Sequence, residues 1–184
     1  MLGNVAETKK VHADSSTFTQ GLSKQEVYAQ IREQAEGLFF EQRNWVCNLA
    51  NTASLLWHGL RSLPPPSSSV NWAGFYVLDA SKPNQLILGP FQGQVACQTI
   101  AFGRGVCGAA AQTGATQLVE DVDKFPGHIA CDAASKSEIV VPIVQNGRVV
   151  AIIDIDCAEL NGFDEEDKTG LEELAQLIAE SSDF

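Results

Sequence analysis

Three cysteines in glycine-containing segments are the residues of this sequence best suited to chemistry. Cys97 lies in GQVACQ, Cys107 in GVCG and Cys131 in GHIACD. Glycine lets the backbone approach a small ligand closely, and a thiolate is both a nucleophile and a redox group. Cys131 is the first candidate nucleophile, because it follows a proline, a glycine and His128 in a long connection. Spacing alone does not decide which of these thiols meet.

Carboxylates form a second group of candidates. Asp154 and Asp156 alternate with isoleucine in AIIDIDC, and residues two apart in a strand point to the same face. Two carboxylates on one face of an apolar strand are costly unless a ligand, a cation or a shared proton offsets their charge. Such a pair, joined by Glu138, can bind an ammonium group or hold a proton for transfer. Trp72, at a strand start, can close the pocket over an alkyl or S-methyl group.

Two helices are predicted before these residues in the sequence, and one helix after them. Ser23 and Glu26 have the spacing of a capping box, which opens a first helix. A second helix carries an apolar face from Val46 to Leu60, with His58 expected to be a core histidine. The last helix is predicted over 164–180, where acidic residues suit the positive end of the helix dipole.

Short strands fill the middle of the chain. Turn residues and alternating apolar positions predict strands over 72–78, 85–91, 94–99, 116–119, 138–145 and 149–157, and a small helix over 105–113. Cys97 is thereby placed in a strand and Cys107 near a helix start, where free N–H groups can stabilise a thiolate. Asn146-Gly147 predicts a tight hairpin. Residues 120–137 form the longest connection, and a connection of this length is usually functional.

This order of elements predicts an α+β domain with a central, mainly antiparallel sheet. The chain has 184 residues, which is enough for one sizeable core. The net charge of -11 argues against general nucleic-acid or anionic-membrane binding, and no apolar run has the roughly 20 residues of a spanning helix. Five cysteines without an export signal indicate a reducing compartment, so we expect a cytoplasmic protein.

Metal binding is a competing interpretation of the cysteines. A structural zinc site is weakly signalled, because the sequence has no CxxC pair and its three histidines are scattered. We therefore expect no metal at these residues. Cys47 and Cys157 are expected to be bystanders or structural residues.

The segments NWAGFY, LGPFQGQVACQTIAFGRGVCG, PGHIACDAASKSEIVVPI and IDIDC resemble, in this order, the free methionine-R-sulfoxide reductases. The resemblance covers Ser23 to Phe184. Residues 1–22 are polar and lack apolar periodicity, which predicts a flexible N-terminal arm. The resemblance implies a GAF-like single domain, with a central mainly antiparallel sheet flanked by helices. It also implies thiol-dependent reduction of free L-methionine-(R)-S-oxide to L-methionine, without a cofactor, with thioredoxin as reductant, and as a possible homodimer.

The resemblance also gives each thiol a role. Cys131 would be the nucleophile, Cys97 the main resolving thiol and Cys107 a further redox cysteine, with the choice of attacking thiol between Cys107 and Cys131 left open. The attacked sulfoxide would leave a cysteine sulfenic acid, which a second thiol converts to an intramolecular disulfide.

The carboxylates and Trp72 would bind the substrate. By the same resemblance, Glu138, Asp154 and Asp156 would hold its ammonium group and its sulfoxide oxygen, while Trp72 would wall the pocket. A non-catalytic GAF module that senses a small ligand or the redox state is the alternative, because GAF domains host many ligands.

Overall fold

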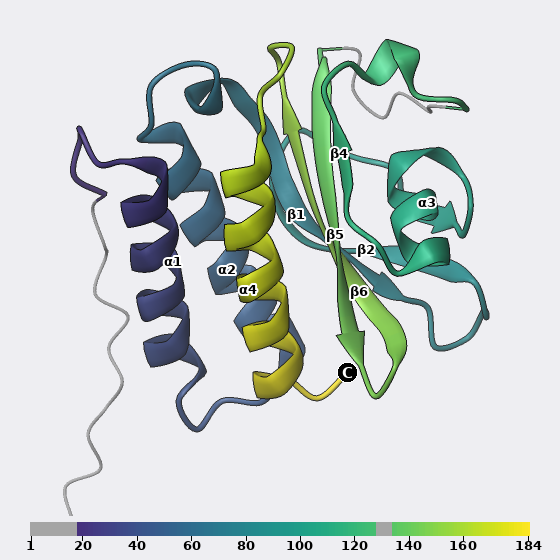
Figure 1. Cartoon of the computed structure of the whole chain (residues 1–184). Helices are drawn as coiled ribbons and strands as arrows, with labels where there is room; N and C mark the ends of the chain where they lie inside the picture. Colours follow the sequence, from purple (N-terminus) through teal and green to yellow (C-terminus); the bar gives the residue numbers. More distant parts are fainter. Residues whose placement is uncertain (1–17, 128–133) are drawn as a thin grey trace, which may run out of the picture.

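One antiparallel sheet forms the centre of the computed structural model, which describes residues 18–127 and 134–184 (Figure 1). Its strands lie in the order β3-β2-β1-β6-β5-β4, and every neighbouring pair is antiparallel. The strands are β1 Val70–Leu78, β2 Gln85–Gly93, β3 Thr99–Ala101, β4 Gln117–Val119, β5 Ser137–Gln145 and β6 Arg148–Cys157. The predicted α+β class with an antiparallel sheet is confirmed.

The β5–β6 hairpin turns at Asn146-Gly147, as predicted. Both turn residues have positive φ, 54° for Asn146 and 74° for Gly147, a conformation that asparagine and glycine tolerate better than other residues. The turn fixes the pairing of the two strands, in which Glu138 lies opposite Asp156 and Val140 opposite Asp154. This register decides which side chains share a face at the far end of the hairpin.

Helices cover the two faces of the sheet unequally. Figure 1 shows three long helices on one side and the short α3 on the other. The helices are α1 Lys24–Phe39, α2 Trp45–Arg61, α3 Gly105–Thr113 and α4 Glu165–Ser181, with short 3-10 turns η1 Ser67–Ser69 and η2 Val122–Lys124. The larger core therefore lies on the α1, α2 and α4 side, and the α3 side is left with less cover.

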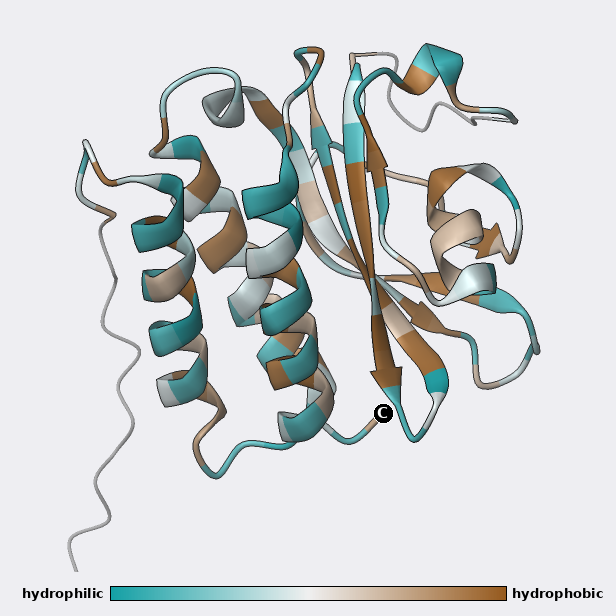
Figure 2. Cartoon of the chain, in the orientation of Figure 1, coloured by the Kyte–Doolittle hydropathy of each residue, from teal (hydrophilic) through white to brown (hydrophobic). Residues whose placement is uncertain are grey.

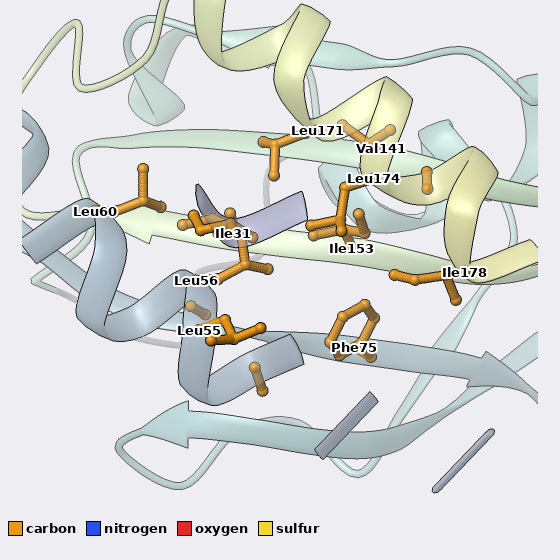
Figure 3. Packing of buried hydrophobic residues seen from close by; sticks show 14 of the residues in the cluster. Ile31, Leu55, Leu56, Leu60, Phe75, Val141, Ile153, Leu171, Leu174 and Ile178 are labelled. Carbon is orange, nitrogen blue, oxygen red and sulfur yellow. The ribbon is translucent and has the colours of Figure 1, made fainter. Parts of the chain in front are cut away.

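Alternation along the central strands divides the apolar residues between these faces. Phe75, Ile153 and Ile155 point into the core beneath the three long helices, where Figure 3 shows Phe75 and Ile153 among side chains such as Leu56 and Leu174. The central strands are the most continuously hydrophobic part of the chain in Figure 2. Burial of these side chains stabilises the sheet as a rigid support.

A second, smaller apolar cluster lies on the α3 side of the sheet. It contains Tyr76, Val106, Ala110 and Ile152, all with less than 3 % of their surface exposed. Gly108 allows α3 to lie this close, because a Cβ there would collide with the carbonyl oxygen of Ala101. This cluster anchors α3 beside the ends of β5 and β6.

Charged caps join α1 to α4. The predicted capping box is confirmed: the Ser23 side chain accepts from the Glu26 N–H, and the Glu26 carboxylate accepts from the Ser23 N–H. Asp167 closes a second capping box at the start of α4 and accepts a hydrogen bond from the Tyr28 hydroxyl. Lys24 Nζ lies 2.7 Å from an Asp167 carboxylate oxygen, so this fully buried carboxylate has three kinds of partner.

The predicted strand over 94–99 is wrong. Strand β2 continues through Gly93, and β3 begins only at Thr99, so Cys97 lies in the connection between them. In that connection side chains of β1 replace strand partners: the Trp72 Nε1 donates to the Gln94 carbonyl, and the Tyr76 hydroxyl donates to the Cys97 carbonyl, both at 3.1 Å. These long-range bonds leave no local pattern in the sequence.

The prediction of which α2 residues are buried is also wrong in part. His58 and Ala50 are exposed, and 48 % of Val46 is exposed, whereas polar Asn48 and Thr52 are buried. Both buried side chains donate hydrogen bonds: Thr52 Oγ1 donates to the Asn48 main-chain carbonyl, and Asn48 Nδ2 donates to Ser182 Oγ. Polar side chains that donate hydrogen bonds can replace apolar ones in a core, which shifts the buried face.

The expected N-terminal arm lies mostly outside the described residues, which start at position 18. Phe18 and Leu22, at the end of that arm, pack against the main core. The arm and the domain boundary at Ser23 stay predictions. Among the described residues, no helix combines the length and the apolar character needed to cross a membrane.

Loss of the Asp167 carboxylate should destabilise the fold strongly. Asp167→Ala leaves Lys24 and Tyr28 without their partner and opens a capping box, so we expect a loss of about 3 kcal/mol in the free energy of unfolding. The exposed Arg32 contacts Glu36 and Glu173 only at the surface, so Arg32→Ala should change it by less than about 0.5 kcal/mol. Urea unfolding of both variants measures the contrast, and equal losses would contradict it.

Candidate active site

Three carboxyl groups gather on the α3 side of the sheet, at the end of the β5–β6 hairpin away from its turn. Glu138 comes from β5, and Asp154 and Asp156 come from β6, with Glu138 directly opposite Asp156. Trp72 of β1 pairs with Asp156 from the other side. Strand alternation thus sends Ile155, which lies between the aspartates, to the helix-covered core and the carboxyl groups to one common site.

A cavity of about 330 Å³ opens over these carboxyl groups. That size lies at the lower end of the range for small-molecule sites. Its lining combines residues of β2, β3, the start of α3 and the β5–β6 hairpin: Gln85, Cys97, Thr99, Ile100, Ala101, Arg104, Gly105, Val106, Cys107, Ser135, Glu138, Asp154 and Asp156. Two of the predicted cysteines and all three predicted carboxylates therefore share one cavity.

Cys107 is a buried thiol in direct contact with a carboxyl group. Its Sγ donates a hydrogen bond to Glu138 Oε1 over 3.6 Å, and only 6 % of its surface is exposed. Burial, followed by the charges of Asp154 and Glu138, raises the pKa of the Cys107 thiol well above its ordinary value. Placement near the start of α3 does not offset these effects, so this thiol stays protonated.

The carboxyl groups hold protons more tightly than exposed carboxyls do. Burial, and then the neighbouring Asp154 and Asp156, raise the pKa of Glu138 well above its ordinary value. Burial also raises the pKa of Asp154, from 3.8 to about 6. Asp154 Oδ1 is buried and has no hydrogen-bond partner within the described part of the chain. Such a site favours a ligand that brings positive charge or accepts a proton.

Trp72 lies beside the main cavity instead of lining it. It borders a much smaller cavity of about 20 Å³ together with Asp154, Asp156 and Gln94. Its ring stacks on Phe91, with centroids 5.2 Å apart, and on Tyr76, at 5.9 Å. Gly74 allows this stack, because a Cβ there would collide with Phe91 and Trp72. The stack buttresses the floor of the site from β1.

The thiols differ in state and in position. Cys97 is half-buried and takes part in a disulfide, while Cys47, Cys107 and Cys157 are free. Cys131, the predicted nucleophile, lies outside the described residues, as does His128. Cys47 is exposed on α2, and Cys157 is buried beside Ser137 and Gly162, so neither of them lines the cavity.

Sequence reasoning missed several cavity residues. Arg104 immediately precedes α3, and its position between Gly103 and Gly105 was a usable signal, because glycines flank exposed functional side chains in many loops. Gln85 and Ser135 gave no comparable signal. Tyr76 was not among the predicted site residues, although its hydroxyl donates a hydrogen bond to the Cys97 carbonyl.

Comparison with known proteins agrees with this geometry. The GAF domain family model matches residues 51–181. The free methionine-R-sulfoxide reductase of Saccharomyces cerevisiae is 56 % identical over 174 residues, covering 94 % of this chain and 95 % of the relative. The chain belongs to the free methionine-R-sulfoxide reductase family of GAF domain proteins. The family resemblance expected from the motifs is thereby confirmed.

Solved structures place the family fold on the whole domain. A structure described as that of the GAF domain is 55 % identical, with a TM-score of 0.87 over 91 % of this chain and 93 % of the other. A free methionine-R-sulfoxide reductase from Neisseria meningitidis, solved in complex with its substrate, is 40 % identical, with a TM-score of 0.81 over 90 % and 94 % of the two chains. The reductase family and this chain share one architecture.

Replacement of Asp154 should increase stability at neutral pH. Its pKa is higher in the folded protein, about 6, than the ordinary 3.8, so the folded state loses stability as pH rises through this interval. Asp154→Asn removes that penalty and should gain about 3 kcal/mol at pH 7 and little below about pH 4. Urea unfolding between pH 4 and 8 measures it, with the exposed Asp123→Asn as control. A gain that does not vary with pH would contradict this assignment.

Proposed function

We propose that this protein reduces free L-methionine-(R)-S-oxide to L-methionine with thiols as the electron source. The observation that carries this proposal is the cavity that joins Cys97 and Cys107 to Glu138, Asp154 and Asp156. Its volume suits a single amino acid, and its charge suits an ammonium group. Relatives that cover most of the chain are named free methionine-R-sulfoxide reductase, which supports the same substrate.

The carboxyl groups would serve the two polar ends of the sulfoxide. Asp156 is the least buried of the three and is suited to hold the substrate ammonium as a carboxylate, with Asp154 beside it. Burial and the neighbouring carboxyl groups raise the pKa of Glu138, which suits its carboxyl group to donate a proton to the sulfoxide oxygen. Proton transfer to oxygen weakens the S–O bond, which is the step that thiolate attack on sulfur requires.

Arg104 would hold the substrate carboxylate. It is exposed at the mouth of the cavity and caps α3 without a side-chain hydrogen bond. The first N–H groups of a helix lack intrahelical partners and favour an anion. A free amino acid needs one positive and one negative subsite, and Arg104 and Asp156, which both line the cavity, supply them. This arrangement favours the free amino acid over a methionine within a peptide, whose carboxyl group is bonded to the next residue.

Cys131 would be the attacking thiol. The free, protonated Cys107 next to two carboxyl groups is a poor nucleophile. The Cys131 thiolate attacks the sulfoxide sulfur, the oxygen passes to the cysteine with a proton, and methionine leaves. The Cys97 thiol then condenses with the Cys131 sulfenic acid, forming a disulfide and releasing water. A redox role for Cys107 stays a prediction.

An external dithiol must then reduce the disulfide. Thioredoxin is the partner we propose, acting in the cytoplasm on Cys97, which lies in an irregular connection at the cavity wall. The homodimer stays a prediction. A non-catalytic sensor with the same cavity would bind methionine sulfoxide without consuming it, so turnover separates the two functions.

Turnover of the separate epimers tests the proposal. Supplied with free methionine sulfoxide and a thioredoxin system, the protein should consume the R epimer and leave the S epimer, because the fixed carboxyl groups and thiols contact only one arrangement of oxygen and lone pair. Cys131→Ser should abolish consumption, and the exposed Cys47→Ser should retain it. Chromatographic measurement of methionine decides, and binding of the R epimer without methionine formation would favour the sensor.

Cys97→Ser should separate the chemical step from recycling. The first turnover depends on the attacking thiol and the carboxyl groups, so a single-turnover experiment should yield close to one methionine per chain. Steady-state turnover with thioredoxin should fall at least tenfold, because no intramolecular disulfide forms. Equal loss of the first turnover and of recycling would contradict the resolving role.

A further inference from the structure

A thiol and two carboxyl groups in the cavity lie close enough together to share one metal ion. One potential ligand atom each from Cys107, Glu138 and Asp154 lies within 4.8 Å of the other two, and all three residues are buried. They come from three elements, α3, β5 and β6, so the tertiary structure and not a sequence motif brings them together. No CxxC pattern marks these three residues in the sequence.

The measured separation of two of these atoms fits tetrahedral coordination. Zinc binds thiolate sulfur at about 2.3 Å and carboxylate oxygen at about 2.0 to 2.2 Å, which places sulfur and oxygen about 3.6 Å apart in a tetrahedral site. Cys107 Sγ and Glu138 Oε1 are 3.6 Å apart. The ligand atom of Asp154 lies within 4.8 Å of both, which makes it the third ligand of the group.

An independent observation also points to a cation. Only 6 % of the surface of Asp154 is exposed, and its buried Oδ1 has no hydrogen-bond partner among the residues that the structure describes. An unsatisfied buried carboxylate oxygen costs free energy, and a metal ion is one partner that removes the cost. Within the described lining of the cavity, Arg104 is the single cationic side chain, and it is exposed at the mouth.

We propose that Cys107, Glu138 and Asp154 form a binding site for a thiophilic divalent cation of the zinc type, with the fourth position open to the cavity. Binding converts the Cys107 S–H to a metal-bound thiolate and releases its proton to solvent, with no change in oxidation state. The site needs neither Cys97 nor the residues outside the described ranges. It therefore operates in the disulfide form of the protein, in which Cys107 remains free.

Occupancy of this site would block the cavity. In the proposed function the substrate ammonium and sulfoxide oxygen contact the same carboxyl groups, so the cation and methionine sulfoxide should exclude each other. This consequence rests on the proposed function, whereas metal binding itself does not. Zinc would thus act as an inhibitor that takes the place of substrate, unlike the structural zinc considered from the sequence.

Metal titration of the oxidised protein tests the site. Oxidation of Cys97 leaves Cys47, Cys107 and Cys157 as the free thiols among the described residues. Zinc titrated against a chromophoric chelator should bind in one equivalent, and cobalt should give a thiolate-to-metal charge-transfer band. Cys107→Ser and Glu138→Gln should each weaken zinc affinity at least tenfold, and Cys107→Ser should remove the cobalt band.

Cys47→Ser is the matched control, because this exposed thiol lies far from the cavity on α2 and its removal should leave zinc affinity unchanged. Circular dichroism confirms that each variant is folded, and if Cys107→Ser does not fold, the loss of affinity in Glu138→Gln decides. Absence of stoichiometric binding, or equal affinity in the folded variants and the unchanged protein, overturns the site. Zinc binding is measured without turnover. Failure to bind zinc would therefore leave the reductase proposal intact.

Discussion

Crowding of acidic groups on a desolvated sheet face is the constraint on which the rest of the structure depends. Glu138, Asp154 and the Cys107 thiol are all buried within the same small space, and each of the three holds its proton more tightly than it would in water. Proteins arrange such shifted groups at functional sites because a proton held near neutral pH can be donated to a substrate. The arrangement lowers the stability of the folded state, so another part of the fold must offset it.

The helix-covered face of the sheet supplies that stability. The same two strands that present carboxyl groups to the cavity present Ile139, Ile153 and Ile155 to the core beneath α1, α2 and α4. Each of these isoleucines is fully buried, and burial of such a side chain contributes about 1.5 to 3 kcal/mol. Because side chains alternate along a strand, one face of the hairpin stabilises the fold and the other carries the reactive groups. On the neighbouring strand β1, the stacked ring of Trp72 supports the reactive face.

Local signals predicted much of this fold and site. The Asn146-Gly147 turn, the Ser23 capping box and the alternation around Asp154 and Asp156 involve residues close in sequence, and each was recognised and observed. Failures occurred where distant groups decide local structure. The connection around Cys97 was mistaken for a strand because its carbonyl partners are the Trp72 and Tyr76 side chains, about 20 residues away in β1. His58 was assigned to the core because apolar periodicity does not reveal that polar Asn48 and Thr52 are buried and donate hydrogen bonds there.

The sequence by itself determined the order of elements, the antiparallel sheet, the family and the list of chemically capable side chains, because these depend on periodicity, turn chemistry and residue type. Only the tertiary structure decided that Cys107 touches Glu138, that Arg104 and Gln85 border the cavity, and that one Asp154 oxygen has no hydrogen-bond partner among the described residues. Proton affinity and metal-ligand distance depend on burial and on atoms brought together from separate strands and helices. Three acidic groups can be listed from the chain, but their pKa values and their shared cavity arise from the strand register and the packing of α3.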